Sequence, residues 1–114
     1  MHELATVDYI IKTVDNICVE QNLTKVDSVT VEIGEVSAII PEYIVDFFNW
    51  SKKKSEYLKD SEMIVETLKA VTYCQDCKKT YATIEYGKEC PYCHSYNTFL
   101  VTGNEYNIKE IVAM

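Results

Sequence analysis

The chain has 114 residues, of which 47% are hydrophobic and 25% are charged, a composition typical of a globular protein with a modest core. Its formal net charge is −7, and all 11 of its basic residues are lysines, which disfavours nucleic-acid binding because phosphate and base recognition depend on positive potential and on arginine. No apolar run approaches the roughly 20 residues that span a bilayer, and the acidic start does not resemble a signal peptide, so a cytoplasmic protein is predicted.

The first segment has the pattern of an amphipathic helix. From Glu3 to about Asn22, apolar residues recur at steps of three and four, which is the period of one helical face. This stripe consists of Leu4, Val7, Ile10, Ile11, Val14, Ile17 and Cys18. Because Cys18 lies on the stripe, we expect it to be a small buried hydrophobic residue.

A strand and a second helix are predicted next. Residues 26–33 alternate between apolar and polar side chains and end at Gly34, as in a half-buried strand. Pro41 suits the first turn of a helix that ends near the lysines at 52–54. The side chains predicted to point inward from this helix are Ile44, Val45, Phe47, Phe48 and Trp50.

Two further strands are predicted, at residues 62–69 and 106–112, on either side of a cysteine-containing segment. This order predicts an α+β fold in which two helices pack on a three-stranded sheet, with a zinc-ribbon-like module of four cysteines inserted before the last strand. The predicted first domain comprises residues 1–69 and 104–114. The predicted second domain comprises residues 70–103.

The inserted segment contains two CxxC pairs, Cys74 with Cys77 and Cys90 with Cys93. Each pair can direct two thiolates to one point, and two pairs complete the tetrahedral shell of four sulfurs that structural zinc prefers. This arrangement is favoured over a redox site, which needs a single CxxC at a helix start, whereas a rubredoxin-like iron site shares the ligand set and stays open. His94 is either a solvated loop residue or an auxiliary zinc ligand or hydrogen-bond donor beside the ligands.

The opening residues form a second candidate metal site. The amine of Met1, the amide nitrogens of His2 and Glu3 and the imidazole of His2 could meet at one ion. Four nitrogens in a plane suit Ni²⁺ or Cu²⁺. The alternative is that this segment is a flexible chain end without a metal.

Four motifs in one order resemble the HypA/HybF family of hydrogenase nickel-incorporation proteins. They are the opening MHE, the strand end VEIGEVS at 31–37, the double CxxC ending in CPYCHS, and GNEYNIKEI at 103–111. The resemblance implies a nickel metallochaperone without enzyme activity, with nickel bound by Met1, His2 and Glu3 and structural zinc bound by the four cysteines. It also implies the fold predicted above.

The resemblance further implies delivery of Ni²⁺ to the apo large subunit of [NiFe]-hydrogenase, together with a HypB-type GTPase, and in some bacteria a contribution to urease maturation. The competing hypothesis from the residues alone is a zinc-ribbon adaptor that acts only through protein contacts. Monomeric, homodimeric and strand-swapped forms all stay open.

The sequence departs from the family pattern at two places. Some members carry a carboxylate after the GE step that supports the nickel site, where this chain has Ala-Ile-Ile-Pro at 38–41, so this support is either absent or supplied by Glu42. Some members have a histidine after the first CxxC, where this chain has Lys78 and Lys79. Only His94 is left for a pH-dependent exchange of zinc ligands, so the resemblance does not extend to a full exchange.

Overall fold

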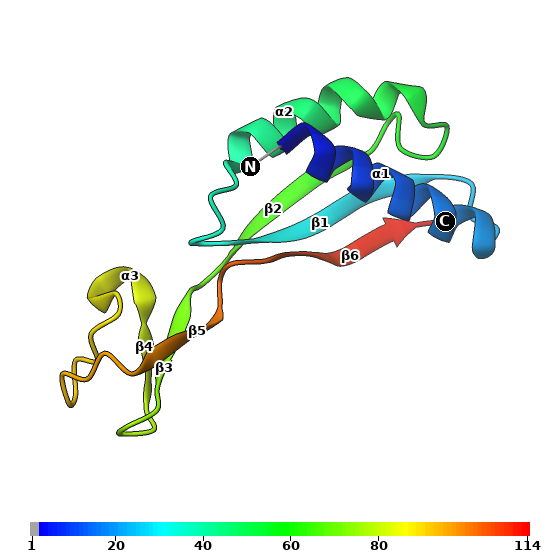
Figure 1. The fold of residues 1–114 in the computed structure, drawn as a ribbon. Helices are drawn as coiled ribbons and strands as arrows, with labels where there is room; N and C mark the ends of the chain where they lie inside the picture. Colours follow the sequence, from blue (N-terminus) through cyan, green and yellow to red (C-terminus); the bar gives the residue numbers. More distant parts are fainter. Residues whose placement is uncertain (1–2) are drawn as a thin grey trace. The chain divides into compact units, whose positions relative to one another are not determined.

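The computed structural model describes residues 3–114, whose helices and strands are drawn in Figure 1. The chain forms two compact units. The first unit comprises the residues up to Glu32 together with Ile39–Glu66 and Asn107–Met114, and the second comprises Ile33–Ala38 and Thr67–Tyr106. None of the helices within residues 3–114 is long and apolar enough to cross a bilayer.

The first unit contains two long helices and most of a three-stranded sheet. Its elements are α1 (Glu3–Glu20), β1 (Val26–Gly34), α2 (Pro41–Ser51), the short 3₁₀ helix η1 (Lys52–Lys54), β2 (Glu62–Leu68) and β6 (Tyr106–Ala113). The strand order is β2-β1-β6, and α1 and α2 lie side by side over the sheet (Figure 1). This arrangement confirms the predicted α+β fold.

The core of this unit lies between the helices and the central strand β1. Its fully or almost fully buried side chains include Val7, Ile10, Val14 and Cys18 of α1, Val29 and Val31 of β1, and Ile44 and Phe48 of α2. The burial of Cys18 confirms its predicted role as a small hydrophobic residue. Burial also raises the pKa of the Cys18 thiol, as does the nearby negative charge of Asp15, so this thiol is a poor nucleophile.

The predicted inward position of Trp50 is wrong, since its side chain is 63% exposed. The buried residues of α2 are Ile44, Phe48 and Ser51, which recur at steps of four and three along one face. Trp50 lies about 200° around the helix from Phe48, at about 100° per residue, and therefore points away from the core.

The second unit contains a small antiparallel sheet. Its elements are β3 (Val71–Cys74), β4 (Thr80–Ala82), the one-turn helix α3 (Thr83–Tyr86) and β5 (Thr98–Thr102), and the strand order is β4-β3-β5. In the central strand, Tyr73 pairs with Thr80 on one side and with Phe99 on the other. The sequence pattern did not predict β5, because three of its five side chains are exposed and it lacks an alternating face.

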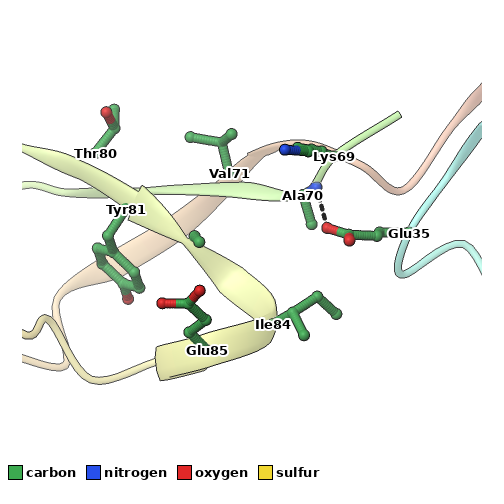
Figure 2. A pocket seen from close by; sticks show the side chains of 9 residues that line it. Glu35, Lys69, Ala70, Val71, Thr80, Tyr81, Ile84 and Glu85 are labelled. Atoms are coloured by element: carbon green, nitrogen blue, oxygen red, sulfur yellow. Dashed lines mark hydrogen bonds between the residues drawn. The ribbon is translucent and has the colours of Figure 1, made fainter. Parts of the chain in front are cut away.

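Glu35 contacts the backbone directly before β3 in this unit. Its carboxylate accepts a hydrogen bond of 2.8 Å from the N–H of Ala70, beside a pocket of about 430 Å³ that Glu35, Tyr81 and Glu85 help to line (Figure 2). The backbones of Gly34 and Gly103 also approach closely, since a Cβ atom on Gly34 would lie 2.1 Å from the carbonyl oxygen of Gly103. The same carbonyl accepts a hydrogen bond of 2.9 Å from the N–H of Val36. These contacts join the Ile33–Ala38 segment to the cysteine-containing part of the unit.

Candidate metal centre

The first cysteine pair sits in a tight turn at residues 74–79, which we name the first knuckle. Cys74 ends β3, and its N–H donates to the carbonyl of Lys79 at 2.9 Å. The N–H of Lys78 donates back to the carbonyl of Cys74, also at 2.9 Å. Lys78 has a left-handed backbone with a φ of 62°, which lets the chain turn directly after Cys77.

The second pair sits in an equivalent turn at residues 90–95, the second knuckle. The N–H of Cys90 donates to the carbonyl of Ser95 at 2.9 Å, and the N–H of His94 donates to the carbonyl of Cys90 at 2.8 Å. His94 has a φ of 63°. The same pair of backbone bonds and the same left-handed residue therefore position Cys93 as they position Cys77.

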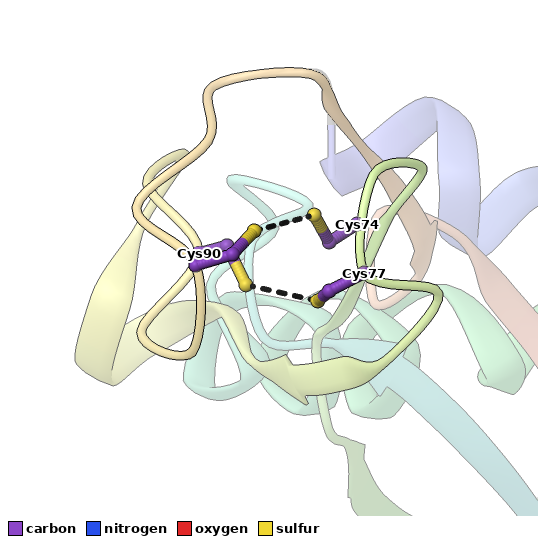
Figure 3. Close-up of side chains that lie close together, drawn as sticks. Cys74, Cys77 and Cys90 are labelled. Atoms are coloured by element: carbon purple, nitrogen blue, oxygen red, sulfur yellow. Dashed lines mark hydrogen bonds between the residues drawn. The ribbon is translucent and has the colours of Figure 1, made fainter.

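The two knuckles bring the four sulfur atoms together (Figure 3). The sulfurs of Cys74 and Cys93 are 3.6 Å apart, those of Cys77 and Cys90 are 3.5 Å apart, and all four lie within 4.8 Å of one another. Four sulfurs around a tetrahedral zinc ion, with Zn–S bonds of about 2.3 Å, would be about 3.8 Å apart. The cluster therefore fits a tetrahedral ion such as zinc.

Ionisation of the metal-free cluster is uneven. Burial acts to raise the pKa of Cys90, but hydrogen bonds from the backbone N–H groups of Cys93 and Tyr92 and from neighbouring thiols outweigh it, and the pKa falls to about 7. The pKa of Cys93 is raised to about 12: the backbone N–H of Ser95 acts to lower it, but burial and the neighbouring thiols outweigh that effect. Because thiols that stay protonated must lose their protons to bind a metal, metal binding releases protons.

Asp76, which lies between the two cysteines of the first knuckle, links the two knuckles. Its carboxylate accepts hydrogen bonds from the hydroxyl of Ser95 and, at 3.3 Å, from the side-chain amide of Asn97. These bonds lower the pKa of Asp76, and the bond from Ser95 has the larger effect. The sequence offered no sign of this link, because its partners lie 19 and 21 residues away.

His94 lies beside the second knuckle, where its ring contacts an acid. Its Nδ1 atom is 2.9 Å from Oε2 of Glu89, and the hydroxyl of Tyr96 donates to Oε1 of the same carboxylate at 2.8 Å. Hydrogen bonds from His94 and Tyr96 lower the pKa of Glu89, and the bond from His94 has the larger effect. Within residues 3–114, the only group of side chains that could hold a metal consists of the four cysteines, so His94 is not placed among the ligands.

Of the three residues predicted to bind nickel, Met1 and His2 lie outside the described residues. Glu3 is in the first turn of α1, where an acidic side chain stabilises the helix dipole. Its Oε2 atom accepts a hydrogen bond of 3.3 Å from the N–H of Ile40, the residue before α2. The Glu3 carboxylate thus connects the starts of the two helices.

A family model described as "Hydrogenase/urease nickel incorporation, metallochaperone, hypA" matches residues 1–113. This chain belongs to the HypA family. The resemblance stated from the motifs is thereby confirmed, and the family is one of maturation factors rather than enzymes.

Relatives of similar length support the assignment to the HypA family. The hydrogenase maturation factor HypA of Aquifex aeolicus is 30% identical over 97% of this chain and 96% of its own length, and that of Picosynechococcus is 26% identical over 97% of each. Among solved structures, the nickel metallochaperone HypA from Helicobacter pylori covers this chain fully and 98% of its own, with 26% identity and a TM-score of 0.77. A second HypA solution structure covers 100% of this chain and 97% of its own, with 28% identity and a TM-score of 0.79.

Proposed function

We propose that this chain is a cytoplasmic nickel metallochaperone that binds Ni²⁺ through Met1, His2 and Glu3 and delivers it to the apo large subunit of [NiFe]-hydrogenase. A HypB-type GTPase is the proposed partner protein in this transfer. Urease is a second proposed recipient of the nickel, during its maturation. The observation that carries the proposal is the family match from residue 1 to residue 113, which includes both the opening MHE and the four cysteines.

The proposed nickel ligands are nitrogen atoms. The amine of Met1, the backbone nitrogens of His2 and Glu3 and the imidazole of His2 form a donor set that suits square-planar Ni²⁺ and not tetrahedral zinc. Backbone amides bind a metal only after losing their protons. Acidification therefore releases the ion, and a site of this kind can hold nickel selectively and still release it.

The side chain of Glu3 has a supporting role in this proposal. Its hydrogen bond from the N–H of Ile40 holds the first turn of α1 against the start of α2. This contact supports the backbone nitrogen of Glu3 at the beginning of a rigid helix. The carboxylate is not needed as a ligand.

The four cysteines have a structural role in the proposal, with zinc as the bound ion. Zinc would be held by Cys74, Cys77, Cys90 and Cys93, and it supplies folding energy to the second unit, whose buried cluster contains Tyr81 and cysteines but few other large apolar side chains. We assign nickel to the first unit and zinc to the second.

The experiment is a Ni²⁺ titration of zinc-loaded protein. It compares the wild type, His2→Ala, a form with one residue added before Met1, and His94→Ala, which is the matched control because the chain has only two histidines. We expect the first two changes to abolish the absorption band of square-planar nickel, while His94→Ala keeps it. Zinc content should stay at about one ion per chain in every form.

The same titration distinguishes a nickel metallochaperone from the competing function. A zinc-ribbon adaptor without a nickel site would show no such band in the wild type. Retention of the band in His2→Ala or in the extended form would place nickel elsewhere and contradict the proposed site. Loss of the band in His94→Ala alone would move the site to the second knuckle.

A further inference from the structure

Helix α2 carries two apolar stripes, of which the core uses only one. The first stripe, Ile44 and Phe48, is fully buried. The second consists of Tyr43, Phe47 and Trp50, which follow one another at steps of four and three and therefore lie on one face. Tyr43 is 51% exposed and Trp50 is 63% exposed, and Phe47 is half-buried. Helix surfaces of soluble proteins are normally polar, so this second stripe needs a different explanation.

The second stripe borders a groove between α1 and α2. A hollow of about 460 Å³ is lined by Leu4, Asp46, Phe47 and Trp50, and Asp46 is its only polar lining residue. A second hollow of about 230 Å³ lies against the same Leu4 and Trp50 side chains, and its other lining residues are Asp8, Ile11, Lys12, Ser51 and Lys54. We name this surface the aromatic groove and define it as Leu4, Ile11, Tyr43, Phe47 and Trp50. All of its residues belong to the first unit.

Carboxylates outnumber lysines at the rim of the aromatic groove, where Asp8, Glu42 and Asp46 accompany Lys12 and Lys54, so the net negative rim favours a cationic partner. Asp8, Glu42 and Asp46 are exposed, and none of the three carboxylates has an ion pair or hydrogen bond among residues 3–114. The ring of Trp50 already accepts a cation, because Nζ of Lys54 lies 5.6 Å from its centroid. A second copy of this chain would bring the same unpaired carboxylates and its own net charge of −7 to the contact.

We propose that the aromatic groove docks an amphipathic helix of a partner protein, with an apolar stripe flanked by lysine or arginine. An apolar stripe with steps of three and four is the surface by which helices pack against one another or enter grooves. The partner's apolar side chains fill the two hollows, and its cations pair with Asp8, Glu42 and Asp46. Leu4 is next in sequence to Glu3, so the docked helix lies beside a residue proposed to bind nickel, although the proposal itself does not depend on nickel.

Trp50 is the only tryptophan, and its emission therefore reports directly on the groove. The probes are three synthetic helical peptides without tryptophan: one with leucines at steps of three and four flanked by lysines, one with glutamates in place of the lysines, and one with serines in place of the leucines. Zinc-loaded protein is titrated with each peptide. We expect the leucine–lysine peptide to shift the Trp50 emission to shorter wavelength and to bind at least about tenfold more tightly than either control, with weaker binding at high salt.

A pair of charge variants separates the groove from the overall acidity of the chain. Asp46→Lys and Glu20→Lys change the net charge equally, but Glu20 lies 16 residues from Leu4 along α1, a distance of about 24 Å. Asp46→Lys should lower the affinity for the leucine–lysine peptide by about fivefold or more and raise the affinity for the leucine–glutamate peptide. Glu20→Lys should change either affinity by less than about twofold.

Three results of the peptide titrations would overturn the proposal. They are equal binding of the lysine and glutamate peptides, equal effects of Asp46→Lys and Glu20→Lys, or binding without a change in Trp50 emission. A shift of the Trp50 emission with protein concentration alone, accompanied by dimers in sedimentation, would assign the groove to a second copy and equally overturn it. Because no nickel is used, failure here is distinguishable from failure of the proposed nickel site.

Discussion

Lys78 and His94 occupy equivalent positions, each directly after the second cysteine of its knuckle, with φ values of 62° and 63°. Each donates its N–H to the carbonyl of the first cysteine of its pair. A left-handed conformation costs an ordinary residue about 1–2 kcal/mol, and in both knuckles the turn imposes it on a residue other than glycine. The backbone geometry that brings the sulfurs together therefore stores strain in two places.

Replacement of Lys78 tests this strain. Lys78→Gly should raise the free energy of unfolding of the zinc-loaded protein by up to about 1 kcal/mol, because glycine adopts this φ without a clash and retains the N–H. Lys78→Val should lower it by more than about 1 kcal/mol, because a β-branched side chain fits this conformation poorly. Denaturant unfolding measures both. Similar stabilities of the two variants would contradict the assignment of strain.

Gly34 and Gly87 make a matched pair for testing a close backbone contact. A Cβ atom on Gly34 would lie 2.1 Å from the carbonyl oxygen of Gly103, whereas one on Gly87, with a φ of 65°, would meet nothing within 4 Å. Gly34→Ala should therefore destabilise the protein by about 3 kcal/mol or more, since two backbone segments must separate. Gly87→Ala meets no neighbouring atom, but its backbone (φ 65°, ψ −130°) lies in a region that L residues rarely adopt, so its cost of about 1–3 kcal/mol is conformational only. Urea unfolding of both variants measures the difference. A smaller loss of unfolding free energy in Gly34→Ala than in Gly87→Ala would show that the two backbone segments separate easily.

The link from Asp76 to the second knuckle should slow metal loss. Asp76→Ala removes the acceptor for Ser95 and Asn97, so the two knuckles are no longer joined by these hydrogen bonds. We expect zinc to transfer to a chromogenic chelator about fivefold faster or more in this variant. Glu85→Ala is the control, because it removes one exposed carboxylate from the same unit without breaking a bond to either knuckle. Equal rates for the two variants would show that the link has no kinetic role.

Zinc affinity should fall in acid. Zinc binds thiolates, and in the metal-free cluster the pKa of Cys90 is lowered to about 7 while that of Cys93 is raised to about 12. Lower pH therefore favours the protonated, metal-free form, and several protons compete with one ion. Chelator competition between about pH 5.5 and pH 7.5 should show the apparent Kd rising more than about tenfold for each unit of acidification. An affinity independent of pH would mean that the cysteines are not the ligands.

Local patterns predicted the parts of the molecule that depend on short segments. The helix at α1, the strand at β1 and the two cysteine turns all arise from periodicity or spacing within a few residues, and each is present. The position of Trp50 was predicted wrongly by the same reasoning, because a helix with two apolar stripes does not reveal which stripe faces the core.

The sequence by itself determined the family, the α+β class and the four cysteines that form the metal-binding group, because these follow from motif order and local spacing. Only the tertiary structure decided which residues support that group and which surface is left open. Asp76 meets Ser95, Glu35 meets Ala70, and Gly34 meets Gly103 across 19, 35 and 69 residues of chain. Contacts at such separations depend on how the elements pack, and a local pattern contains no information about them.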